Sequence, residues 1–266
     1  MAYWQRGQLM VVRSPDMMPG AREAHVWYSW AEQCSAPHLQ ESYRALLNAE
    51  ERERLGRYAF DYLKAEYLLT RALCRTTLSR YADVDPADWT FCTNQYGRPE
   101  IAGPAAARGL RFNLSNARSL VACVVTRDAD AGIDVEESSH AGDLLAIADT
   151  VFSPVERAAL RALPHALQRQ RFFDLWTLKE SYIKARGMGL SLPLQQFSFD
   201  VGLPAIGIAF APEMAQSADE WQFALRRLGP DHTLAVSVQR GPGPDFGVSM
   251  REVVPDAGSE ALDEAA

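Results

Sequence analysis

Gly132-Ile133-Asp134-Val135-Glu136 is the stretch of sequence that most strongly decides how this chain folds. Its apolar and polar side chains alternate, which is typical of a β-strand with one buried face. Ile133 and Val135 are expected to point into the core, so Asp134 and Glu136 share the opposite face. The sequence therefore predicts a strand that holds two carboxylates side by side.

This pair of carboxylates suggests a site for a cation. Two carboxylates so close repel each other unless a positive charge lies between them. Hard divalent cations, above all Mg²⁺, prefer oxygen ligands and often combine one or two carboxylates with the phosphate groups of a substrate. The alternative is an exposed strand face on which Asp134 and Glu136 contact only water.

A second motif spans Trp176–Lys184, within a helix predicted from about residue 166 to residue 186 that ends at Gly187. Glu180 and Lys184 lie four residues apart, so they face the same side of this helix. One interpretation is a surface ion pair of little energetic value. The other is that Glu180 supplies a third carboxylate to the cation, or takes a proton from a hydroxyl group as a general base.

Lysine is rare in this chain, because only Lys64, Lys179 and Lys184 occur among its 27 basic residues. Two of the three fall in this one helix. Lysine differs from arginine in that burial can lower its pKa enough for it to exchange protons. This choice favours metal-assisted chemistry on a phosphoryl group over the surface ion pair. Trp176 is interpreted more simply, as a core aromatic residue.

The remaining hydrophobic patterns predict an α+β fold. Helical segments are expected at 42–81, 140–152, 154–163 and 166–186, and strands at 25–30, 89–92, 110–115, 120–125, 132–136, 197–201, 206–210, 221–225 and 233–238. The uniformly apolar run 120–125 should be buried on both faces, and the last four strands should form one antiparallel sheet. The predicted units are an N-terminal half (1–127), a C-terminal half (128–244) and an acidic, mobile tail (245–266).

The charge of the chain limits its partners. The formal net charge is −7, which argues against a nucleic acid or an anionic membrane as a general partner. Residues 252–266 carry five acids and no basic residue, so much of this acidity belongs to the tail. Residues 52–80, in contrast, hold seven basic and three acidic residues, and this segment suits a small anionic ligand.

The four cysteines are far apart and have no neighbouring histidines: Cys34, Cys74, Cys92 and Cys123. Their spacing predicts reduced thiols and a cytoplasmic location rather than a zinc site or a disulfide framework. We expect neither a signal peptide nor a membrane span.

The two motifs, in this order, resemble the signature of the phosphopantetheinyl transferases, and chain length and upstream motifs resemble the Sfp-type branch. Supporting stretches follow the same pattern: Thr93–Pro99, Phe112–Ser115, Phe152–Glu156 and Gly189–Leu194. The resemblance covers roughly residues 45–240. It implies two pseudo-symmetric halves in one chain, and transfer of the 4′-phosphopantetheine arm of coenzyme A to a serine of an apo acyl or peptidyl carrier protein.

The resemblance also implies roles for individual residues. Asp134, Glu136 and Glu180 would hold Mg²⁺ against the pyrophosphate of coenzyme A. Glu180 would also be the general base, and Lys184 would contact the phosphate and stabilise charge as the bond breaks. Two arginines, Arg54 and Arg98, fall where basic residues of the family reach the 3′-phosphate and neighbouring parts of coenzyme A, although both also suit solvated positions on a helix and a turn. Arg71 and Arg75 are expected to serve the helix or the interface between the halves.

One position departs from the family pattern. After Phe-Asn-x-Ser the family usually has a histidine that contacts a coenzyme A phosphate, whereas this chain has Asn116. Asparagine keeps a hydrogen-bond donor but cannot become cationic. We therefore expect Ser115 and Asn116 to bind coenzyme A more weakly, or with a different dependence on pH.

Two other functions remain compatible with the sequence. One is an inactive module of the same family that binds coenzyme A or a carrier protein, which would not need Asp134, Glu136, Glu180 and Lys184 together. The other is a metal-dependent pyrophosphatase, which usually needs a denser cluster of carboxylates. Two halves in one chain would make a monomer sufficient.

Overall fold

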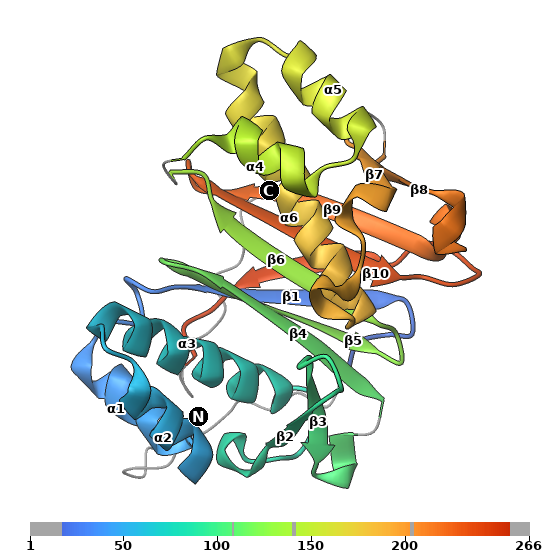
Figure 1. The fold of residues 1–266 in the computed structure, drawn as a ribbon. Coiled ribbons are helices and arrows are strands. Elements are labelled where there is room, and N and C mark those ends of the chain that lie inside the picture. The colour runs from blue at the N-terminus through green and yellow to red at the C-terminus, as the bar shows by residue number, and fades with distance from the viewer. Residues whose placement is uncertain (1–17, 108, 140–141, 203–204, 256–266) are drawn as a thin grey trace.

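The computed structural model describes residues 18–107, 109–139, 142–202 and 205–255, and they form four stacked layers (Figure 1). Two β-sheets lie face to face in the middle, and helices cover the outer face of each sheet. This arrangement confirms the predicted α+β fold. No helix in the described ranges is both long and apolar enough for a membrane crossing.

Three helices form the outer layer of the N-terminal part: α1 (Pro37–Leu46), α2 (Ala49–Arg57) and α3 (Asp61–Leu78). The sequence predicts one helical segment from about 42 to 81, so the breaks are a correction. Asn48 interrupts the segment because its side chain accepts a hydrogen bond from the Glu51 amide, and the Glu51 carboxylate accepts one from the Asn48 amide. This capping box fixes the start of α2.

The first sheet has the strand order β11-β1-β5-β4. Its strands are β1 (Glu23–Trp30), β4 (Leu110–Ala117), β5 (Leu120–Arg127) and β11 (Gly247–Glu252). The central strand β5 is buried on both faces, as predicted. Val121, Cys123 and Val125 pack with the helical layer, while Ala122 and Val124 pack against the second sheet.

The second sheet has the order β6-β10-β9, formed by β6 (Ala131–Glu137), β9 (Trp221–Leu228) and β10 (His232–Gln239). Ile133 and Val135 enter the core between the two sheets, as the alternation in their strand predicts. The outer face is covered by α6 (His165–Arg186), and α4 (Leu144–Val151) and α5 (Pro154–Ala162) pack against α6.

Two hairpins stand apart from these sheets: β2 (Thr90–Thr93) with β3 (Pro99–Gly103), and β7 (Phe197–Asp200) with β8 (Gly207–Phe210). The expectation that the last four predicted strands form one sheet is therefore wrong. β9 and β10 pair with each other, but β7 and β8 pair only between themselves and pack against the helical layer through residues such as Phe197.

The prediction of a mobile tail from residue 245 is wrong for its first part. β11 pairs in parallel with β1, and the Val253 amide then donates a hydrogen bond to the Tyr28 carbonyl at 2.9 Å. Phe246 and Val253 are buried, so apolar burial holds this segment despite its glycines, prolines and acids. The most acidic part of the predicted tail, 256–266, lies outside the described residues, as do residues 1–17 of the predicted N-terminal half.

Candidate functional site

Gly132 brings the two predicted motifs together. Helix α6 crosses β6 so closely that a Cβ atom on Gly132 would lie 2.1 Å from the Ser181 carbonyl oxygen and 2.3 Å from the Ala185 amide nitrogen. Only glycine allows this approach. Gly187 ends α6 with a φ of 61°, as the sequence predicts. The face of β6 that carries the carboxylates therefore lies directly against the C-terminal half of α6.

Asp134, Lys184 and Ser115 form the centre of the site. The Lys184 ammonium group donates hydrogen bonds to Asp134 Oδ1 at 2.6 Å and to Ser115 Oγ at 2.8 Å, and Ser115 Oγ donates to Asp134 Oδ1 at 3.0 Å. Asp134 is 4% exposed, and burial raises its pKa although Lys184 opposes the shift. Its second oxygen, Oδ2, is buried without a hydrogen-bond partner.

Glu136 lies beside this centre and is oriented by Trp176. The indole nitrogen donates a hydrogen bond to Glu136 Oε1 at 2.7 Å, and the ring stacks on Phe172. Burial, and then the charge of Asp134, raise the pKa of Glu136 to about 7. Trp176 is thus more than a core aromatic residue. Its position one helical turn before Glu180 is the sequence signal that places it at the site.

Asn113 and Ser115 join the two sheets, although only Ser115 is among the predicted site residues. The Asn113 side chain accepts a hydrogen bond from the Ile133 amide at 3.0 Å, and Ser115 Oγ accepts one from the Val135 amide at 3.1 Å. These side chains of β4 take the place of a neighbouring strand along β6. Their spacing of two residues is the available signal, since it places both on one face of β4.

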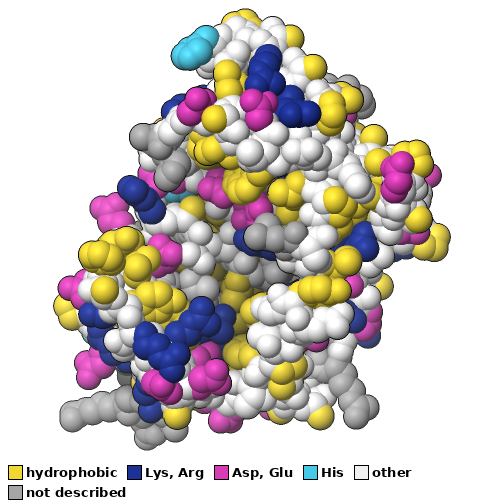
Figure 2. Space-filling view, in the orientation of Figure 1, with side chains coloured by type: hydrophobic (Ala, Val, Ile, Leu, Met, Phe, Trp, Pro, Cys, Tyr) yellow, Lys and Arg dark blue, Asp and Glu magenta, His cyan; other side chains and the backbone are white. Residues whose placement is uncertain are grey.

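Two cavities meet at Lys184. The larger has a volume of about 940 Å³, and its lining includes Asp134, Glu136 and Trp176. The smaller has a volume of about 270 Å³ and is lined in part by Glu180. Lys184 lines both. Figure 2 shows this face of the molecule hollowed between its upper and lower parts, with acidic side chains gathered along the hollow.

The three predicted carboxylates are close enough to influence one another. Burial, followed by the charge of Asp134, raises the pKa of Glu180, as it does for Glu136. Among the residues that the structure describes, no three candidate ligands converge as they would around a metal ion. The Lys184 ammonium lies against Asp134 instead. The unpartnered Asp134 Oδ2 and the set of acidic oxygens nevertheless fit a cation that prefers oxygen.

Comparison with known proteins decides the family. The family model described as the 4′-phosphopantetheinyl transferase superfamily matches residues 130–236. The 4′-phosphopantetheinyl transferase HetI of a Nostoc species is 30% identical over 230 residues, which cover 85% of this chain and 91% of the relative. The chain belongs to the 4′-phosphopantetheinyl transferase family.

A second relative of the transferase is the 4′-phosphopantetheinyl transferase Sfp of Bacillus subtilis, which is 35% identical over 158 residues, or 59% of this chain and 68% of that protein. It supports the Sfp type. The solved structure of the Thermotoga maritima holo-[acyl-carrier-protein] synthase covers 42% of this chain and 64% of its own, with a TM-score of 0.35 and 17% identity.

The two arginines singled out in the transferase sequence differ in their surroundings. The Arg98 side chain is 10% exposed and lies between the β2–β3 hairpin and α6, where it donates to the Ala185 carbonyl at 2.9 Å and pairs with Asp130 at 3.2 Å. It also lines the smaller cavity. Arg54 is exposed on α2, stacks over Tyr67 and lines neither cavity. The solvated alternative is therefore wrong for Arg98 and remains open for Arg54.

Asn116 lies on the lining of the larger cavity, where its side-chain amide donates a hydrogen bond to Glu66 on α3. Burial raises the pKa of Glu66. Asn116, where this transferase departs from the family pattern, is thus a neutral side chain bonded to an acidic residue rather than a cation.

Lys179, in contrast to Lys184, points away from both cavities. It is completely buried and pairs with Glu156 of α5 at 2.9 Å. It also donates to the carbonyl oxygens of Leu194 and Phe197, each at 2.7 Å. Burial lowers the pKa of Lys179 to about 8. The two lysines of the motif therefore have separate functions, and Lys179 joins α5 and α6 to the segment before β7.

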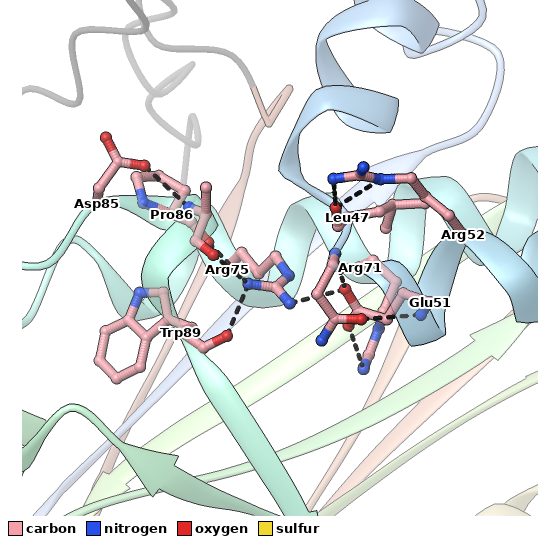
Figure 3. A network of polar contacts seen from close by, with 10 residues as sticks. Leu47, Glu51, Arg52, Arg71, Arg75, Asp85, Pro86 and Trp89 are labelled. Carbon is pink, nitrogen blue, oxygen red and sulfur yellow. Dashed lines mark hydrogen bonds and ion pairs between the residues drawn. The ribbon is translucent and has the colours of Figure 1, made fainter.

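The basic segment 52–80 is largely occupied by structural contacts. Arg75 is fully buried, pairs with Glu51 at 2.7 Å and donates to the carbonyls of Pro86 and Trp89 (Figure 3). Arg71 also reaches Glu51, at 3.4 Å. Both arginines hold the N-terminal helices and the loop before β2 together rather than the interface between halves.

Proposed function

We propose that this transferase attaches the 4′-phosphopantetheine arm of coenzyme A to a serine hydroxyl of an apo acyl or peptidyl carrier protein. The oxygen of that serine attacks the phosphorus that bears the pantetheine arm. The bond to the bridging oxygen of the pyrophosphate breaks, and adenosine 3′,5′-bisphosphate leaves. The observation that carries the proposal is the position of Lys184, which lies on Asp134 at the junction of the two cavities.

Glu180 is the proposed general base. It lines the smaller cavity beside Lys184, and no described residue donates a hydrogen bond to its carboxylate, so the group is available for a proton. Burial raises the pKa of Glu180, which brings this carboxylate closer to the pKa of an effective base at neutral pH. Glu180 would take the proton of the carrier serine, and Lys184 would remain charged beside the phosphate oxygens.

Asp134, Glu136 and Glu180 are the residues that would hold Mg²⁺. When bound, the ion would neutralise charge on the pyrophosphate and polarise the reacting phosphorus. Trp176 would keep Glu136 turned toward the cavity through its hydrogen bond, and Ser115 would position both Asp134 and Lys184. No covalent enzyme intermediate is required.

Coenzyme A itself would occupy the larger cavity, whose volume suits a ligand of this size. Ser115 and Asn116 line that cavity, while Arg98 would approach the ligand from the smaller one and Arg54 from α2.

We propose that the enzyme acts as a monomer, because both cavities are formed by one chain. Four free thiols, three of them buried, support a location in the reducing cytoplasm.

The test is to incubate the protein with coenzyme A, Mg²⁺ and an apo carrier protein and to weigh the intact carrier. We expect the mass of the carrier to rise by one phosphopantetheine group, and Glu180→Gln to lower the rate by about 10²- to 10⁴-fold without changing the melting temperature. Glu213→Gln, on an exposed turn, is the matched control.

Other outcomes would support the competing functions. Full activity of Glu180→Gln would contradict the role of this residue. Hydrolysis of coenzyme A without modification of the carrier would indicate a pyrophosphatase. Binding of coenzyme A without any turnover would indicate an inactive module.

A further inference from the structure

Arg118 has an unusual backbone for its residue type. It occupies the tight turn between β4 and β5 with a φ of 43°, in the left-handed region. Turns of this kind favour glycine or asparagine, because a side chain there crowds the backbone. Such a conformation in another residue is a reason to look for a function. The structure shows where the side chain of Arg118 lies.

The side chain of Arg118 lies on the lining of the larger cavity and is 76% exposed. Its Nε atom is 3.7 Å from Glu137 Oε2, at the long end of ion-pair distances. An exposed pair at this separation contributes little energy, so the guanidinium can exchange Glu137 for a stronger partner at little cost.

The charged side chains that line the larger cavity include two cations that could bind phosphate groups. Among the residues that the structure describes, three carboxylates line it, those of Asp134, Glu136 and Glu137, together with two cations, Lys184 and Arg118. Lys184 is committed to Asp134 and Ser115 at the centre of the site. Of the other arginines proposed to reach coenzyme A, Arg98 lines the smaller cavity and Arg54 lines neither, so Arg118 is the arginine positioned for a second phosphate group in the larger cavity.

Lys184 and Arg118 approach the larger cavity at different places along β4 and the turn after it. Ser115, which contacts Lys184, lies within β4, whereas Arg118 lies three residues later, in the turn that follows this strand. Coenzyme A has anionic groups at two places as well, the pyrophosphate at the reacting end and a phosphomonoester on the 3′-oxygen of the ribose. The two cations can thus serve two different phosphates.

We propose that Arg118 binds the 3′-phosphate of coenzyme A and supplies the positive charge that Asn116, two residues earlier, cannot carry. The inference rests on coenzyme A as the substrate. A guanidinium matches a phosphomonoester well because it donates two parallel hydrogen bonds to its oxygens. Arg118 adopts the left-handed backbone conformation although that conformation favours a smaller residue.

The test compares coenzyme A with 3′-dephospho-coenzyme A by calorimetry, without a carrier protein. We expect Arg118→Ala to weaken the binding of coenzyme A by about 10- to 100-fold and to leave that of the dephospho compound within about threefold. The matched control is Arg127→Ala, at the other end of β5, whose Nε also lies 3.7 Å from a carboxylate, that of Asp128.

A second variant separates binding from folding. Arg118→Gly suits the left-handed backbone, so it should melt at or above the wild-type temperature and still lose the preference for coenzyme A. An equal loss for both ligands, or no loss for coenzyme A, would overturn the proposal. This calorimetric measurement needs no transfer to a carrier protein. If the carrier assay fails but Arg118→Ala still weakens the binding of coenzyme A far more than that of the dephospho compound, the result would count against the proposed function alone.

Discussion

Two ion pairs on α6 show how differently one helix uses the same residue type. The side chains of Lys179 and Glu156 are 0% and 1% exposed, whereas the side chains of Lys184 and Asp134 are 28% and 5% exposed. The two lysines are five positions apart, so they point about 140° apart around the helix. One pair is enclosed between α5, α6 and the segment before β7, and the other borders two cavities.

The number of satisfied donors distinguishes the two lysines. An ammonium group has three hydrogens to donate. Lys179 uses all of them on protein acceptors, namely Glu156 and the carbonyls of Leu194 and Phe197. Lys184 donates to Asp134 and Ser115, which leaves one hydrogen for a ligand. A lysine whose donors are all used within the fold is structural, and one with a donor left at a cavity is available for chemistry.

The enclosed pair should give the largest effect on stability. Lys179→Met would leave the Glu156 carboxylate buried beside an apolar side chain, and we expect a loss of about 3–5 kcal/mol in the free energy of unfolding. Urea denaturation measures this loss. The double variant Lys179→Met with Glu156→Gln should recover part of it. A single variant as stable as the wild type would contradict the distinction between the pairs.

The open pair should give a smaller effect, and on rate rather than on stability. We expect Lys184→Met to lower the rate of carrier modification by about 10²- to 10³-fold, because a charge beside the reacting phosphate is lost. Its melting temperature should fall less than that of Lys179→Met, because Lys184 and Asp134 border a cavity that water can enter. Lys64→Met, which removes the remaining lysine at an exposed site, is the control. If Lys184→Met loses stability but each folded molecule keeps the wild-type rate, Lys184 would be a structural lysine and the distinction between the two pairs would be wrong.

The smallest effect is expected from adding a cation to the lining of the larger cavity. Asn116→His should lower the KM for coenzyme A severalfold while the maximal rate stays intact. The decrease should be larger at about pH 6, since an ordinary histidine is mostly protonated only below about pH 6.5. Steady-state kinetics at two pH values measure this effect. A KM that is unchanged or raised at both would show that residue 116 does not face the ligand.

Local patterns predicted much of this molecule. Alternation placed the carboxylates of β6 on one face, and the helical period placed Glu180 and Lys184 on the same side of α6. The different surroundings of Lys179 and Lys184 depend on what packs against each face of the helix, and no single segment contains that information. The same holds for Ser115, whose partners are 19 and 69 residues away in the sequence.

The segment after residue 245 illustrates the same limit. Its composition resembles that of a tail, yet β11 pairs with β1, which precedes it by more than 200 residues. A parallel pair of such separation leaves no turn signal in the sequence. The capping box at Asn48, by contrast, is local and could have been used to divide the predicted helical segment.

The position of β11 also affects how the chain can be assembled. β1 lies between β5 and β11, so a fragment that ends at residue 127 would leave one edge of β1 without hydrogen-bond partners. Unprotected strand edges promote association between chains. During synthesis that edge would remain open until β11 itself leaves the ribosome, so the first sheet closes only after all strands of the second sheet have been made.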